Sequence, residues 1–175
     1  SLSSARAPSD LYSVDFDQQR VERWTESETG GLNTAAFAEA EVVRWKSFDG
    51  LTISGLLTRP PQRFAGKRPV IISIHGGPEA QATMGFQSRW NYFIQELGIT
   101  VIEPNVRGSD GYGKTWYHAD DGTKRLGIIT DIEDCARYVR KSFAAGGKEP
   151  KVGILGGSYG GYSTLIGMTM FAGAY

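Results

Sequence analysis

The 175 residues of this chain are 40% hydrophobic and 11% aromatic, a composition that supplies an apolar core and excludes a disordered chain. Its 19 Lys and Arg residues balance 19 Asp and Glu residues, so no bulk charge points to nucleic acid or an anionic membrane. The sequence shows no apolar run as long as a membrane span and no signal peptide, and its single cysteine, Cys135, excludes an intrachain disulfide framework. We therefore expect a cytoplasmic protein without a nucleic-acid or membrane partner.

The first predicted element is a β-hairpin near the N-terminus. Residues 11–16 and 20–25 alternate between apolar and polar, and Asp17-Gln18 can form the turn between them. Because an isolated hairpin is marginally stable in water, we expect this one to belong to a larger sheet. Residues 26–38 are polar, contain glycine and alanine, and are predicted to be a linker.

A second hairpin is predicted around Asp49-Gly50, since strand-like residues on both sides of Asp-Gly are a strong hairpin signal. A surface loop follows at 60–68. Residues 69–74 are then apolar on both faces, which is typical of a strand buried in a parallel sheet. This strand ends in the sequence HGGP at residues 75–78.

Helices and strands alternate in the next part of the chain. A helix is predicted over 86–97, a second buried strand over 99–102 closed by Pro104, and a glycine-rich loop over 105–113. A further helix over 128–143 has an apolar face. This face includes Cys135, so we interpret that residue as a buried structural thiol rather than a nucleophile.

The stretch KVGILGGSYGGY, residues 151–162, combines a short apolar strand, the pattern G-x-S-x-G and the start of a helix. A strand, a tight turn with serine at its apex and a helix together predict a nucleophile elbow with Ser158 as the nucleophile. Glycines two residues before and after the serine are expected because side chains there would collide with the neighbouring strand and helix. The alternative is a glycine-rich turn that binds a phosphate at the helix N-terminus.

The order of the elements predicts an α/β fold, namely the first half of an α/β-hydrolase with a mostly parallel sheet and an antiparallel N-terminal hairpin. In this fold the oxyanion of the reaction is stabilised by the backbone N–H after the nucleophile, here Tyr159, and by the loop after the earlier strand. That loop contains His75 and Gly76, and its glycines allow close approach to the reacting atoms. The alternative for His75 is an ordinary core or solvated histidine.

Three motifs together carry a resemblance to a known family: HGGP, NVRGSDGYG at 105–113, and GGSYGGY at the elbow. They resemble the catalytic domain of prolyl oligopeptidase family (S9) serine peptidases, most of all the acylaminoacyl-peptidase and dipeptidyl-peptidase-like branch. The resemblance implies that residues 39–175 are part of this catalytic domain. It also implies that residues 1–38 are the end of a β-propeller blade and a linker.

The resemblance also implies roles for single residues. Ser158 would be the nucleophile, Tyr159 would supply an oxyanion N–H, and His75 would occupy the position of a second, side-chain oxyanion donor. Arg107 lies in the signature loop, and we interpret it as an organiser of the site, with substrate contact as the alternative. We expect no metal and no cofactor, because metal clusters, dinucleotide fingerprints and P-loops are missing from the sequence.

The sequence departs from the family in its catalytic triad. The triad order in this fold is Ser, then Asp or Glu, then His, but no acidic residue or histidine follows Ser158. His118 precedes the serine and would serve as the base only in a rearranged topology. Asp131 and Asp134 suit the N-terminal dipole of the helix at 128–143.

The first hypothesis is a serine peptidase that hydrolyses short peptides, with the triad Asp and His missing from this chain. The alternatives are a carboxylesterase on the same fold and a non-catalytic fragment that assembles with a complementary half. The expected partners are a short peptide, a β-propeller domain and the remaining half of the hydrolase domain. The elbow strand would be an exposed apolar edge, at which a homo-oligomer can also form.

Overall fold

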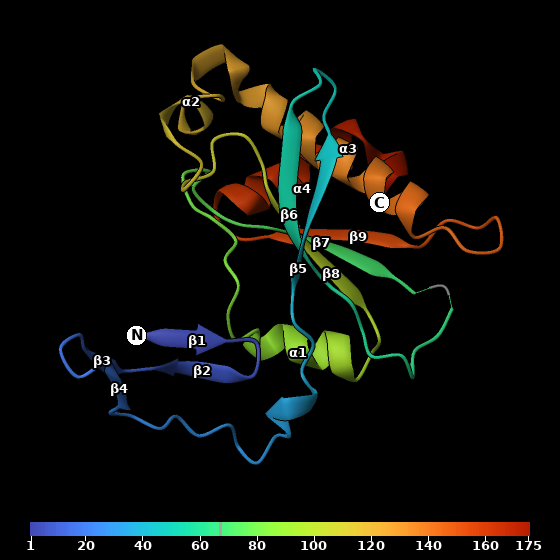
Figure 1. The fold of residues 1–175 in the computed structure, drawn as a ribbon. Coiled ribbons are helices and arrows are strands. Elements are labelled where there is room, and N and C mark those ends of the chain that lie inside the picture. The colour runs from blue at the N-terminus through green and yellow to red at the C-terminus, as the bar shows by residue number, and fades with distance from the viewer. Residues whose placement is uncertain (67) are drawn as a thin grey trace.

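A five-stranded mixed sheet forms the centre of the computed structural model, which describes residues 1–66 and 68–175 (Figure 1). The strand order is β5-β6-β8-β7-β9. The strands, in chain order, are β5 (Glu41–Lys46), β6 (Thr52–Thr58), β7 (Val70–Ile74), β8 (Thr100–Asn105) and β9 (Val152–Gly156). The predicted hairpin around Asp49-Gly50 is confirmed as β5 and β6, which pair antiparallel from Glu41 opposite Leu57 to Lys46 opposite Thr52.

The sheet is less parallel than the sequence predicts. β7 lies between β8 and β9 and is parallel to both, whereas β6 is antiparallel to both β5 and β8. β8 also runs beyond Pro104, which was expected to close it, and ends at Asn105. Its ladder with β7 ends at Ile102, so Pro104 faces a partner strand on the β6 side only, opposite Gly55. Proline is tolerated where a strand is paired on one side.

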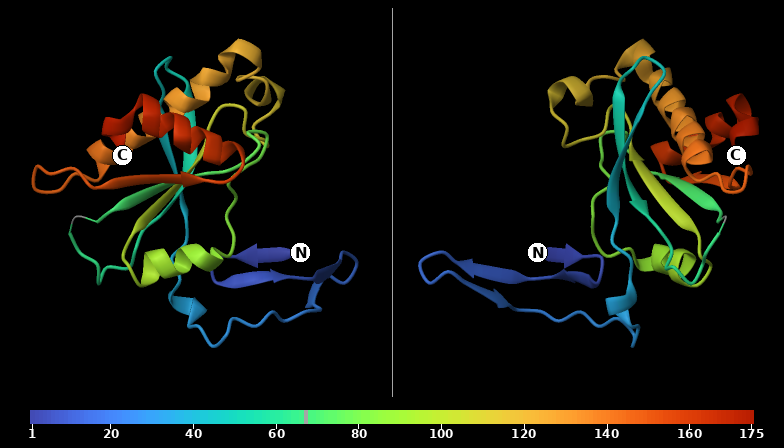
Figure 2. Two further views of the ribbon diagram at one scale, coloured as in Figure 1. Left: turned by 180° about the vertical axis from the view of Figure 1, so that it is seen from behind. Right: turned by 45° about the vertical axis from the view of Figure 1, so that its right-hand side comes forward.

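Helices cover both faces of the sheet (Figure 2). α3 (Leu126–Ser142) and α4 (Tyr159–Met170) pack on one face, and α1 (Ser88–Gln95) packs against β8 on the other. In β7 the side chain of Ile72 points to the α3 face and that of Ile71 to the α1 face. The prediction that this strand is apolar on both faces and lies in a parallel arrangement is therefore confirmed.

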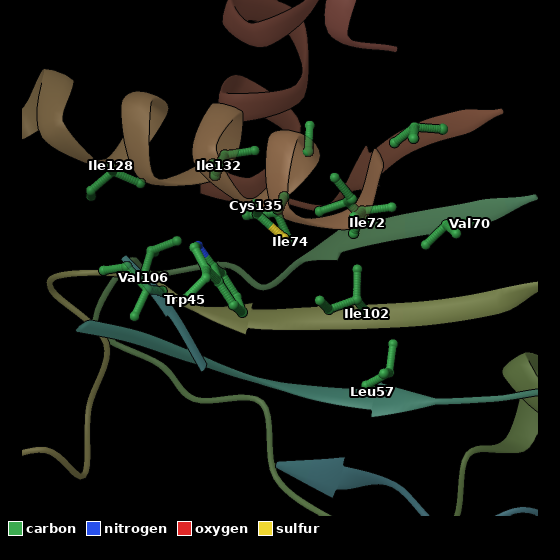
Figure 3. Close-up of a cluster of buried hydrophobic side chains, with 14 residues drawn as sticks. Trp45, Leu57, Val70, Ile72, Ile74, Ile102, Val106, Ile128, Ile132 and Cys135 are labelled. Atoms are coloured by element: carbon green, nitrogen blue, oxygen red, sulfur yellow. The ribbon is translucent and has the colours of Figure 1, made fainter. Parts of the chain in front are cut away.

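The main core lies between the sheet and α3 (Figure 3). Ile72 and Ile102 from the strands meet Ile132 and Cys135 from the helix, and all four are almost fully buried. The ring of Trp45 stacks on Tyr138 at 5.3 Å between centroids. Burial raises the pKa of the Cys135 thiol, which agrees with the structural role predicted for it.

The helices differ in detail from the predicted ones. α1 is shorter than the predicted 86–97, and α3 begins at Leu126, two residues earlier than predicted. A short helix and a 3₁₀ turn lie between the glycine-rich loop and α3, where no element was predicted: α2 (Lys114–Tyr117) and η2 (Gly122–Arg125). Further 3₁₀ turns are η1 (Thr34–Ala36) and η3 (Ala172–Ala174). None of the helices in the described part of the chain is long and apolar enough to cross a membrane.

The N-terminal segment forms two small hairpins, the first of which lies beside α1 (Figure 1). β3 (Tyr12–Asp15) and β4 (Arg20–Arg23) are the predicted pair, and β1 (Leu2–Ser4) pairs with β2 (Ala7–Asp10) in a hairpin that the sequence did not reveal. Within the described residues each hairpin is a two-stranded sheet of its own, so the expected larger sheet is not formed here. The buried carboxylate of Asp10 accepts hydrogen bonds from the Arg23, Thr25 and Ser27 side chains, which ties the two hairpins together.

Candidate active site

Ser158 stands at a sharp turn between β9 and α4. β9 ends at Gly156 and α4 begins at Tyr159, so only two residues separate strand from helix. The backbone of Ser158 has φ 53° and ψ −123°, and its side chain is exposed. A non-glycine residue with positive φ is strained, and such strain concentrates where a side chain is presented for function. The strand, turn and helix predicted around this serine are present.

The glycines of the turn are required by close packing. A side chain at Gly160 would collide with the carbonyl oxygen of Ile74 and would come within 2.9 Å of the carbonyl oxygen of His75. A side chain at Gly156 would lie 2.5 Å from the backbone of Gly160. A Cβ added at Gly157, in contrast, meets nothing within 4 Å. The collisions predicted two residues before and two residues after the serine are thus found, with β7 on one side and α4 on the other.

The loop after β7 lies directly against Ser158. A Cβ at Gly76 would be 3.2 Å from Ser158 Cβ and 3.7 Å from Ser158 Oγ. The structure therefore brings the HGGP loop and the elbow together, as α/β sheets do where their parallel strands end. Because glycine carries no side chain here, a substrate carbonyl can reach the serine hydroxyl along this backbone.

The His75 ring is held on both sides. Nδ1 lies 2.7 Å from the carbonyl oxygen of Gly76, and Nε2 lies 3.0 Å from Ser109 Oγ. A carbonyl oxygen only accepts, so Nδ1 carries a proton. Burial lowers the pKa of the ring and so favours its neutral form, although the hydrogen bond to Gly76 acts in the opposite direction. In the neutral ring Nε2 carries no proton and accepts a hydrogen bond from the Ser109 hydroxyl. Both ring nitrogens are thus engaged, Nδ1 by Gly76 and Nε2 by Ser109, and the side-chain oxyanion role expected for His75 stays a prediction.

Tyr159 is the first residue of α4. Its backbone N–H belongs to the first turn of the helix, where amides have no acceptor one turn earlier. The phenol of Tyr159 packs near the ring of Tyr162, at 5.4 Å between centroids. Its hydroxyl is buried without a hydrogen-bond partner among the described residues, and burial raises its pKa to about 12. This tyrosine is therefore neutral at physiological pH.

Arg107 is buried in a network of ion pairs. Its Nε and one terminal nitrogen bind the two oxygens of Asp131 at 2.8 and 2.7 Å, a bidentate pair, and its other terminal nitrogen binds Asp49 at 2.9 Å. The guanidinium holds the pKa of Asp49 below its ordinary value. Ser47 Oγ completes the network by donating to Asp131 at 2.6 Å. The guanidinium thus joins the loop after β8 to α3 and to the β5–β6 turn.

These contacts correct the interpretation of two acidic residues. Because α3 begins at Leu126, Asp131 lies beyond its first turn, and its fully buried carboxylate is the counter-ion of Arg107 rather than a partner of the helix dipole. Asp134 contacts Ser47 at 3.2 Å and Arg137. Sequence reasoning missed the pairing of Arg107 with Asp131 and Asp49, although a buried arginine requires such counter-ions.

The second histidine, His118, makes its side-chain hydrogen bond to Asp121 and not to Ser158. His118 is exposed, and its Nδ1 lies 2.9 Å from Asp121 Oδ2. Within residues 1–66 and 68–175, no side-chain hydrogen bond joins either histidine ring to Ser158. The same residues contain no group of three His, Cys, Asp or Glu side chains that could hold a metal ion.

Comparison with known proteins agrees with this geometry. The model of the prolyl oligopeptidase family matches residues 85–175. The chain is 33% identical over 136 residues to dipeptidyl aminopeptidase BIII of Pseudoxanthomonas mexicana, covering 74% of this chain and 19% of the relative. It is 31% identical over 165 residues to prolyl oligopeptidase A of Amanita bisporigera, covering 91% of this chain and 21% of the relative.

The fold of this chain is also similar to that of a solved peptidase structure. An acylaminoacyl peptidase in complex with Z-Gly-Gly-Phe-chloromethyl ketone superposes with a TM-score of 0.74 at 27% sequence identity, over 96% of this chain and 26% of that one. The chain thus spans about a fifth of the length of the two curated relatives.

Proposed function

Because this chain belongs to the prolyl oligopeptidase family, we propose that the protein is a serine peptidase that cleaves short peptides through an acyl-enzyme on Ser158. The observation that carries the proposal is the elbow itself. A strained, exposed Ser158 stands between β9 and α4, and the Gly76 backbone borders it. The relatives named above are peptidases, which supports peptides as the substrate class.

In the proposed reaction Ser158 Oγ attacks the carbonyl carbon of the scissile peptide bond and gives its proton to a base. The negative charge that develops on the carbonyl oxygen is stabilised by the backbone N–H of Tyr159 and by the backbone of the loop at Gly76. The base returns the proton to the leaving amine, the peptide bond breaks, and water then hydrolyses the acyl-enzyme. We assign the base and its orienting carboxylate to a histidine and an acidic residue outside these 175 residues.

Arg107 is assigned a supporting part in this site. Its ion pairs with Asp131 and Asp49 fix the start of the loop after β8, which in turn contacts the loop after β7. The guanidinium is buried and its hydrogen bonds are taken up by these carboxylates, which supports an organising role over contact with substrate.

The domain assignment belongs to the same proposal. Residues 1–38, with their small hairpins, would be the end of a β-propeller blade and a linker, and residues 39–175 part of the hydrolase domain. The independence of the two hairpins from the central sheet supports this division. A propeller and the remainder of the hydrolase domain would then be the intramolecular partners of this chain.

A carboxylesterase is the second candidate, because a glycine-lined approach to an elbow serine is also the geometry of esterases with this fold. Hydrolysis rates of the full-length protein on dipeptidyl and acylaminoacyl p-nitroanilides and on p-nitrophenyl esters separate the two. We expect amide hydrolysis that is lost in Ser158→Ala and retained in Ser163→Ala. Ester hydrolysis with no amide hydrolysis would replace the peptidase by the esterase, and an unchanged Ser158→Ala variant would refute both.

A further inference from the structure

We propose that Ser109 is a positioning residue of this site: its hydroxyl donates to Nε2 of His75 and so holds the ring where Nδ1–H reaches the Gly76 carbonyl beside Ser158. The inference rests on the proposed function, since it concerns the loop that would stabilise the oxyanion. Ser109 does not touch the nucleophile, so it acts through His75 and Gly76.

The direction of the hydrogen bonds follows from what each atom can do. The neutral imidazole carries one proton, and the 2.7 Å contact with the Gly76 oxygen requires that proton on Nδ1. Nε2 is then an acceptor, and the Ser109 hydroxyl 3.0 Å away is its donor. With the hydroxyl removed, the ring loses its contact at Nε2 and is held only by the Nδ1–H bond to the Gly76 carbonyl, so its position is less well defined.

Ser109 is itself held firmly in place. It is fully buried, and its backbone N–H donates to the Val106 carbonyl at 3.1 Å. The preceding Gly108 has φ +87° and donates to the Trp116 carbonyl at 3.0 Å, and a side chain there would collide with the carboxylate of Asp120. Arg107, one residue earlier, is anchored by its ion pairs. The hydroxyl is thus presented to His75 by a segment with little freedom.

Further contacts join the same two loops. Asp110 N–H donates to the Ala80 carbonyl at 2.9 Å, and the Asn105 side chain binds both the N–H and the carbonyl of Ala82, at 2.8 and 3.1 Å. These contacts hold the later part of the loop after β7. The Ser109–His75 contact holds its beginning, which is the part next to Ser158.

The consequence for the site comes from the planarity of the peptide. When the ring fixes the Gly76 carbonyl, the N–H of Gly77, on the other side of the same peptide plane, is fixed in the opposite direction. The orientation of the loop amides beside Ser158 therefore depends on Ser109. Such preorganisation stabilises charge that develops only in the transition state, so its loss lowers kcat more than it raises KM.

Two isosteric variants of the full-length protein test the proposal. Ser109→Thr keeps the hydroxyl and Ser109→Val lacks it, while both add the same volume, so their difference reports on the hydrogen bond alone. We expect kcat of Ser109→Val to be about 10-fold below that of Ser109→Thr, with KM within about twofold. The rate of labelling by a fluorophosphonate should fall by the same factor. Ser109→Ala, which adds no volume, should show the same change against the wild type.

The control variant is Ser163→Ala. Ser163 is fully buried in α4, and its hydroxyl has no hydrogen-bond partner among the described residues. We expect its kcat, KM and labelling rate to equal those of the wild type. A loss of the same size in this control would mean that the effect reports on removal of any buried hydroxyl, and would overturn the proposal.

A double-mutant cycle with His75→Ala separates positioning from stability. If Ser109 acts through the ring, Ser109→Ala has no further effect on kcat in the His75→Ala background. Additive losses overturn the proposal, as do equal kcat values for Ser109→Thr and Ser109→Val. Failure of the proposed function looks different, because the wild type itself would then not be labelled at Ser158.

Discussion

Ser158 and the glycines around it show how one residue constrains its neighbours. The positive φ of the serine turns the chain so tightly that Gly160 approaches the backbone of β7 and Gly156 approaches that of α4. This crowding could be predicted from the sequence, because the G-x-S-x-G pattern already states which positions must lack a side chain.

A methyl group at Gly160 should therefore be costly. We expect Gly160→Ala to lower the free energy of unfolding by about 3 kcal/mol, since the new Cβ would collide with the Ile74 carbonyl. The matched variant Gly157→Ala meets open space and should change it by less than about 1 kcal/mol. Urea unfolding of both variants measures the difference, and equal stabilities would contradict the packing described here.

The Arg107 network should contribute to stability far more than an exposed ion pair. Replacing Arg107 with Met leaves the buried carboxylate of Asp131 without its counter-ion, and we expect a loss of about 3–5 kcal/mol. The matched change Arg137→Met removes an exposed guanidinium from Glu133 and should cost less than about 1 kcal/mol. A small loss at Arg107, seen in the same urea titrations, would show that the network does not hold the loop.

The contacts of His75 and Ser109 could not be predicted from the sequence. HGGP could be placed beside the nucleophile from the sequence, but the partners of the imidazole could not. Ser109 is 34 residues from His75, and no periodic pattern connects them. The same holds for Arg107 and Asp131, which are 24 residues apart.

At the scale of elements, the strands of the central sheet were predicted well because their patterns are local, whereas the β1–β2 hairpin was missed. Asp49-Gly50 specifies the β5–β6 turn, and the apolar run at 69–74 specifies a strand buried on both faces. Helix ends were predicted less accurately. The N-cap residues of α1 and α3, Gln87 and Arg125, make no side-chain hydrogen bond to the first turn of their helices. The start of each helix is therefore not marked by a capping residue that could be recognised in the sequence.

β9 and α4 form an edge that is apolar and uncovered. β9 pairs only with β7 among the described residues, and α4 exposes Leu165 at 70% and Met168 at 48%. A strand with one unpaired edge beside exposed apolar side chains is a site of association. A second copy of the chain, or the further part of the hydrolase domain that we propose, would bury the same surface.

Residues 1–175 expressed alone should therefore self-associate. We expect Leu165→Lys to shift the sedimentation distribution toward the monomer, because it places a charge on the apolar face of α4. Phe16→Lys is the matched control, since Phe16 is 86% exposed and lies between β3 and β4, a hairpin that is away from this edge (Figure 1). A monomeric wild-type chain, or an equal shift in the control, would mean that this edge does not mediate association.

At the scale of the whole molecule, the arrangement of sheet and helices brings together loops that are distant in the sequence. The loops after β7 and β8 and the elbow after β9 all lie where these parallel strands end, so the residues that carry the proposed chemistry meet in one place (Figure 1). The order of strands and helices predicted this meeting. It could not predict the antiparallel placement of β6 against β8, because periodicity alone does not specify which strands become neighbours.

The central claim is that Ser158 is an activated nucleophile. Incubation of the full-length protein with a fluorophosphonate, followed by intact mass and peptide mapping, tests it most directly. We predict a single adduct on the peptide that contains Ser158, and none in Ser158→Ala. A folded protein that remains unlabelled, or an adduct that persists in Ser158→Ala, would contradict the claim.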